Sequence, residues 1–244
     1  MNTKGTLSYQ ASFFANVESI HPSADTIPPL LDAFRDMGFL PTTFTQITPG
    51  GARTRLRLSS PREEWFVDFD VNRINIVKNA TQPWGTNLGS PSGFTNDVAG
   101  FVDRILKLHP VSGSRLALVT SELVDTGTAV TPLDAYAALA RPLPFYSSKA
   151  PREWQLRSAD RVTCDIAGEA ELLNVITKIG RAQGKFETPA GVQEFDDLSV
   201  ELDINTYQDN PSPRFDGQGL RAFFAIALEQ REHLMAQLGE RLAD

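Results

Sequence analysis

The chain has 244 residues and a formal net charge of −7, with 41% hydrophobic and 22% charged residues. This composition is typical of a globular protein with one large domain or two small ones. The acidic balance opposes non-specific binding to nucleic acid. The only cysteine, Cys164, excludes an internal disulfide and a zinc site built from several cysteines.

No targeting or membrane signal is visible in the sequence. The first residues lack a basic segment followed by an apolar run, and no stretch approaches the roughly 18 apolar residues of a membrane span. We therefore expect a cytoplasmic protein without a membrane partner. Cys164 alternates with Val162 and Ile166, which predicts a buried strand residue rather than a catalytic thiol.

Hydrophobic periodicity predicts strands and helices in the first 124 residues. Alternation of apolar and polar residues is typical of strands, and apolar residues three or four positions apart are typical of helices. The second helix is expected to be capped by Thr95 or Asn96. Strands are predicted at 7–17, 42–48, 53–58, 65–71, 73–78 and 114–123, and helices at about 28–37 and 96–108.

The clearest pattern lies at 53–78. Leu56 and Leu58 fall on one side of the first segment, and the next two segments continue the alternation. A period of two residues predicts a three-stranded antiparallel meander here.

Residues 125–152 are predicted to connect two halves of the chain. Thr131 and Pro132 are expected to start a short helix that ends at Leu139, and the prolines at 141–144 indicate an extended connector. Strands follow at 154–166, 172–182 and 195–207, with a hairpin closing at Gly184 and a long amphipathic helix at 216–242. Segment 172–182 also fits a helix, but its β-branched residues favour a strand.

The predicted fold class is therefore α+β, with mainly antiparallel sheet, amphipathic helices and a long C-terminal helix. The predicted parts are an N-terminal half (1–124), a connector (125–152) and a C-terminal half (153–244). Each half has antiparallel strands, a proline-containing loop and then a helix. Duplication of one α+β unit and independent similarity both explain this order.

Two pairs of carboxylates alternate on predicted strands, and they form the sharpest candidate site. Asp68 and Asp70 share one strand face, as do Glu201 and Asp203. If the halves pack face to face, all four converge and can bind a divalent cation or act as acid and base. The simpler interpretation is the solvated face of an antiparallel sheet.

A short basic stripe is the best candidate for nucleic-acid binding. Arg53, Arg55 and Arg57 alternate on one strand face. Cross-strand ion pairs with Asp68 and Asp70 explain the same residues without a ligand.

Three segments resemble a sporadically distributed family of uncharacterised bacterial proteins of about 250 residues. They are the end of the meander at 73–78, the helix at 94–108 with the strand at 115–120, and the strand at 202–207 that leads into the terminal helix. The resemblance covers most of the chain. It implies a place among mobile or defence-related genes, including anti-phage defence, and it transfers no activity or site residue.

Three functions follow as hypotheses. The first is a non-enzymatic interaction subunit, such as an adaptor, inhibitor or structural partner, which binds another protein or a second copy of itself. The second is an enzyme that uses the strand carboxylates with a divalent cation, and the third is a nucleic-acid-binding module. The first is preferred because we find no motif for catalysis or phosphate binding, and we expect no cofactor.

Overall fold

The computed structural model describes residues 2–125, 131–140, 143–147, 151–188 and 191–243. Within these residues, nine strands form one antiparallel sheet in the order β2-β3-β4-β5-β1-β6-β9-β8-β7. The strands are β1 (Asn2–Phe14), β2 (Leu40–Thr48), β3 (Gly51–Ser59), β4 (Trp65–Asp70), β5 (Arg73–Asn79), β6 (Arg115–Asp125), β7 (Gln155–Ile166), β8 (Glu169–Thr188) and β9 (Gly191–Thr206). The α-helices are α1 (Ile27–Ala33), α2 (Pro91–Leu108), α3 (Pro132–Leu139), α4 (Pro144–Ser147) and α5 (Gly217–Ala243). The α+β class with a large antiparallel sheet and a long C-terminal helix is confirmed.

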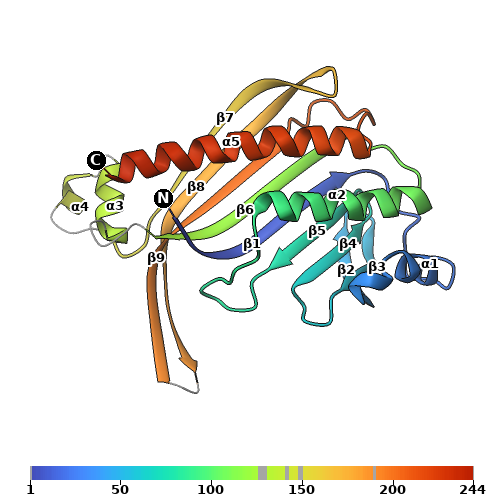
Figure 1. The fold of residues 1–244 in the computed structure, drawn as a ribbon, viewed down its shortest axis with the longest axis horizontal. Coiled ribbons are helices and arrows are strands. Elements are labelled where there is room, and N and C mark those ends of the chain that lie inside the picture. The colour runs from blue at the N-terminus through green and yellow to red at the C-terminus, as the bar shows by residue number, and fades with distance from the viewer. Residues whose placement is uncertain (1, 126–130, 141–142, 148–150, 189–190, 244) are drawn as a thin grey trace.

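Two helices cover one face of the sheet. Figure 1 shows α2 and α5 lying along this face, with α1 at one end and α3 beside the C-terminal end of α5. Alternate strand residues such as Tyr9, Val67 and Ile204 are buried beneath them. No helix in the described ranges is both long and apolar enough to cross a membrane.

The helix α2 begins earlier than predicted. Its N-cap is Ser90, whose hydroxyl accepts a hydrogen bond from the backbone N–H of Gly93 at 3.0 Å, and Pro91 occupies the first turn. The predicted caps at 95 and 96 were wrong. A proline fits the first position of a helix, where its missing N–H breaks no hydrogen bond, so the helix can begin at Pro91. The early start buries Phe94, which stacks on Trp65 at 5.5 Å.

The strand prediction for 172–182 is confirmed, but the strand continues beyond Gly184 to Thr188. Gly184 was predicted to close a hairpin, and this was wrong. The ring of Phe195 on β9 lies where a Cβ of Gly184 would be, at 2.5 Å, so the glycine leaves room for a cross-strand aromatic. The predicted helix from Thr131 to Leu139 is confirmed as α3, with Thr131 forming a capping box with Asp134.

The far ends of β8 and β9 form a projecting hairpin, which we call the arm (residues 183–188 and 191–196). The last residue pairs between this hairpin and its neighbours β7 and β6 involve Gly180 and Leu198. Beyond them, within the described part of the chain, the two strands pair with each other alone and extend away from the helices (Figure 1). Phe186 of the arm stacks on Trp84 of the β5–α2 loop, with ring centroids 4.0 Å apart.

Both parts of the chain enter one continuous sheet because β1 pairs with β6 along most of its length. In each part, a meander returns to pair with the first strand: β5 with β1, and β9 with β6. A helix then follows, α2 or α5. The order of first strand, meander and helix thus occurs twice, and the second copy begins at β6. This boundary lies before the predicted connector at 125–152. Residues 126–130, 141–142 and 148–150 of that connector lie outside the described ranges.

Candidate functional site

The sheet face opposite α2 and α5 is polar near its centre, and we call it the open face. On β9, Val200, Leu202 and Ile204 are buried on the helix side. Because side chains alternate along a strand, Asp203 and Asn205 project from the open face. The same alternation on β7 and β8 brings further polar side chains to this face.

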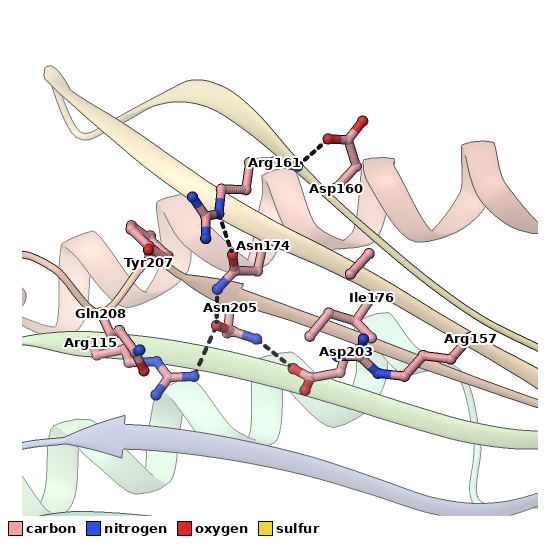
Figure 2. Close-up of a pocket in the computed structure, with 11 residues that line it drawn as sticks. Arg115, Arg157, Asp160, Arg161, Asn174, Ile176, Asp203, Asn205, Tyr207 and Gln208 are labelled. Atoms are coloured by element: carbon pink, nitrogen blue, oxygen red, sulfur yellow. Dashed lines mark hydrogen bonds between the residues drawn. The ribbon is translucent and has the colours of Figure 1, made fainter.

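A groove with a volume of about 620 Å³ lies on the open face where β6, β9, β8 and β7 run side by side (Figure 2). We call it the arginine groove because three guanidinium groups line it. Arg115 comes from the start of β6, and Arg157 and Arg161 come from β7. The other lining residues are Ala159, Asp160, Asn174, Ile176, Asp203, Asn205, Tyr207 and Gln208.

Strand register places these side chains in rows across the sheet. Asn205 is the cross-strand partner of Asn174, which in turn is the partner of Arg161. Ala117 lies opposite Asn205 on β6, two residues beyond Arg115. The groove therefore joins residues far apart in the sequence, such as Arg115 and Asn205, which are 90 positions apart.

Two carboxamides connect Arg115 and Arg161 in one hydrogen-bond chain, which Figure 2 shows as dashed lines. Arg161 donates from Nε to Asn174 Oδ1 at 3.3 Å, and Asn174 donates from Nδ2 to Asn205 Oδ1 at 3.0 Å. Arg115 donates from Nη2 to the same oxygen at 2.9 Å, and Asn205 Nδ2 donates to Asp203 Oδ1 at 2.8 Å. These bonds fix the side chains and leave several guanidinium N–H groups available to a ligand.

None of the three groove arginines forms an ion pair with a carboxylate of the described residues. Arginines elsewhere on the sheet do so: Arg57 pairs with Asp68, and Arg73 with Asp70. Guanidinium groups without counter-ions in a shared groove are the typical recognition elements for carboxylates and phosphates.

The surroundings of Arg115 make its charge available for an anion. Its guanidinium lies 4.7 Å from the ring centroid of Phe14, and its buried Nε has no hydrogen-bond partner among the described residues. Burial lowers the pKa of Arg115, and nearby Asp203 partly offsets this effect. A partly desolvated cation gains more from an incoming anion than a fully hydrated one, because less water must be displaced. Arg161 lies over the ring of Tyr207 at 3.9 Å, which fixes its plane.

The predicted carboxylate cluster does not form. Asp68 and Asp70 lie on β4, whereas Glu201 and Asp203 lie on β9, with β5, β1 and β6 between them. At about 4.8 Å per strand, the two pairs are about 19 Å apart. Convergence of the four carboxylates required the two halves to pack face to face, but the halves join edge to edge in one sheet, which keeps the pairs separate.

Each carboxylate of these pairs has a local partner. Arg57 binds Asp68 with two hydrogen bonds, at 2.5 and 2.7 Å, which confirms the predicted cross-strand ion pair. Arg73 binds Asp70. On β9, Lys178 binds Glu201, while Asp203 lies in the arginine groove. The described residues contain no group of three or more side chains placed to hold a metal ion.

The predicted basic stripe is also occupied by structural contacts. Arg53 forms an ion pair with Glu18, and Arg57 with Asp68. Arg55 is buried and donates to main-chain carbonyl groups, at Val17, Glu18, Ile20, Phe69 and Asp70. Arg55 thus holds the β1–α1 loop against the end of β4, and the three arginines do not form a free cationic surface.

Sequence reasoning missed the groove arginines. Arg157 and Arg161 lie four residues apart on one strand, so their shared face was readable from the alternation. Arg115 joins them only through the order β6-β9-β8-β7, which no local pattern encodes. A scan against protein-family models and a search of curated proteins found no match to this chain.

Proposed function

We propose that the protein is a non-enzymatic interaction subunit that holds an acidic segment of a protein partner in the arginine groove. The observation that carries the proposal is the set of three guanidinium groups on an open sheet face that form no ion pair among the described residues, two of them, Arg115 and Arg161, joined by two carboxamides. Guanidinium groups bind carboxylates with paired hydrogen bonds, and carboxamides both donate to and accept from a peptide backbone.

The charges within the groove favour a segment with a few spaced carboxylates over a polyphosphate chain. Asp203 shares the open face with the arginines, whereas the side chain of Asp160 alternates to the other face, so a continuous run of negative charge would meet one like charge. The net charge of −7 adds long-range repulsion of nucleic acid. Glutamate or aspartate side chains on an extended peptide can be placed to contact the arginines while avoiding Asp203.

The arm supports the same proposal as a second contact surface. It projects beyond the sheet and exposes Val192, which is 63% accessible. A partner that follows the open face from the groove can continue along the arm, which enlarges the interface beyond the few residues of the groove. The resemblance to proteins of mobile and defence-related genes is consistent with a subunit that acts through a partner, and it remains a prediction.

A titration with defined probes tests the proposal. The variant Arg157→Glu/Arg161→Glu reverses two groove charges, and Arg62→Glu/Arg152→Glu applies the same charge change at two exposed arginines outside the groove. The probes are a fluorescent glutamate-rich peptide and a single-stranded oligonucleotide. We expect the wild type and the control variant to bind the peptide, with affinity that falls as salt is added.

The groove variant should bind the peptide about 100-fold more weakly, because two charge-assisted hydrogen bonds of about 1.5 kcal/mol each are lost. Equal peptide binding by the two double variants would contradict the proposal. Binding of the oligonucleotide but not of the peptide would support a nucleic-acid module instead.

A further inference from the structure

The two edges of the sheet differ in charge. The edge strand β7 carries Arg157, Asp160, Arg161 and Asp165, whereas the opposite edge strand β2 (LPTTFTQIT) carries no charged residue. Charged side chains on an edge strand oppose pairing with another strand, and their absence leaves the backbone open to it. The strand β2 is therefore the unprotected edge.

The side chains of β2 are also well exposed. Ile47 is 86% accessible and Leu40 is 56% accessible, and the residues from Pro41 to Thr43 are exposed as well. Threonine, phenylalanine and isoleucine favour extended conformation, so β2 combines high strand propensity with exposed apolar surface. Among the strands that the structure describes, β2 has a neighbour, β3, on only one side.

The hairpin register shows which backbone groups of β2 are free. Thr48 and Gly51 flank a two-residue turn, so their backbones hydrogen-bond to each other. In an antiparallel pair, every second residue of β2 from Thr48 then also hydrogen-bonds to β3. Thr43, Thr45 and Ile47 occupy the alternate positions, where the N–H and C=O groups point away from β3. Pro41 belongs to the same alternate set of positions, so its missing N–H removes no hydrogen bond to β3.

We propose that two copies of this chain pair through β2, antiparallel and centred on Thr45, and so form one continuous sheet. This register places Thr45 opposite Thr45 of the second copy, and Thr43 opposite Ile47 of the second copy. The three outward residues then form on the order of six N–H···O bonds across the two-fold axis. Pro41 falls opposite Pro49 of the second copy, so prolines end the ladder on both sides.

A second copy fits this edge better than another extended chain because β2 is compatible with itself. No charged side chain meets its like across the axis, and threonines stand opposite each other at the centre, a favourable β-branched pair. The contact is independent of the arginine groove. The groove lies at the β7 side of the sheet, so the pair would carry one groove at each end.

Cysteine cross-linking tests the register. In a Cys164→Ser background, Thr45→Cys puts two thiols opposite each other with Cα atoms about 5.5 Å apart, within the range of a disulfide. The matched control is Thr54→Cys, which replaces the exposed partner of Thr45 on β3. Its two copies would be three strand spacings apart, about 14 Å, which is too far for a disulfide. We expect a covalent dimer from Thr45→Cys and none from Thr54→Cys under mild oxidation.

Sedimentation at several concentrations tests the assembly without cross-linking. The wild type and Thr54→Lys should form dimers, whereas Thr45→Lys should raise the dimer dissociation constant at least about tenfold, because two ammonium groups meet at the axis. Circular dichroism confirms that each variant is folded. A monomeric wild type, equal cross-linking at both positions, or open-ended assemblies would each overturn the proposal. Salt should leave the dimer unchanged while it weakens peptide binding in the groove, so the two proposals fail separately.

Discussion

Replacement of Arg231 by methionine should destabilise the protein by about 3–5 kcal/mol, because it leaves a buried carboxylate without its counter-ion. Arg231 on α5 donates from Nη2 to Glu122 Oε2 on β6 at 2.5 Å, and the side chains are only 7% and 3% accessible. After the substitution, the hydroxyl of Tyr9, at 3.2 Å from Oε1, is the one side-chain partner that Glu122 keeps among the described residues. For a chain of this size, the loss corresponds to a decrease in Tm of about 6 to 20 °C.

Urea unfolding of the wild type and four variants measures this effect. Arg231→Met and Glu122→Leu should each lose about 3–5 kcal/mol, whereas the double variant should lie within about 2 kcal/mol of the wild type, since neither charge remains buried alone. Arg221→Met is the control on the same helix as Arg231: it breaks the exposed pair between Arg221 of α5 and Asp103 of α2, and should cost less than about 1 kcal/mol. A loss below about 1 kcal/mol for Arg231→Met, or additive losses in the double variant, would refute the reasoning.

Three further outcomes are expected. Gly113→Ala should cost about 1–3 kcal/mol in urea unfolding, because its Cβ would lie 2.8 Å from the ring of buried Phe13; an unchanged midpoint would contradict this packing. Phe186→Ala should speed proteolysis of the arm without a change in global Tm above about 2 °C, because the stack on Trp84 ties down a hairpin that lacks further strand neighbours. Burial lowers the pKa of His109 below 6.5, so as the pH decreases the unfolded state takes up this proton at a higher pH than the folded state does. The free energy of unfolding should therefore fall as the pH decreases through 6.5. His109→Asn should flatten this part of the stability profile, and parallel profiles would disprove the assignment.

The local elements were predictable because their signals are local. The alternation at 53–78 placed Leu56 and Leu58 on the buried face, and both are fully buried. The errors arose where a residue has two roles. Pro91 was placed ahead of the predicted helix at 96–108 although it opens α2, and Gly184 was predicted to close a hairpin although it makes room for Phe195. In both cases, the residue type is compatible with two local structures, and packing with a distant residue accompanies the one that forms: Phe94 on Trp65, and Phe195 over Gly184.

The site was less predictable because it depends on strand order. Asp68 and Asp203 share a strand-carboxylate pattern, but their partners differ: one meets Arg57 on the adjacent strand, and the other faces the groove. An arginine on a strand forms an ion pair where the adjacent strand places a carboxylate opposite it, as β4 places Asp68 opposite Arg57. Arg115 gains Asn205 as a partner only because β6 pairs with β9.

Affinity capture from the native host tests the central claim most directly. The tagged wild type, Arg157→Glu/Arg161→Glu and Arg62→Glu/Arg152→Glu are purified in parallel, and the stoichiometry of co-purified proteins is measured. We predict a stoichiometric partner with an acidic segment on the wild type and on the control variant, and its loss from the groove variant. A partner retained equally by all three proteins, or none on the wild type, would contradict the assignment of the arginine groove as the partner-binding site.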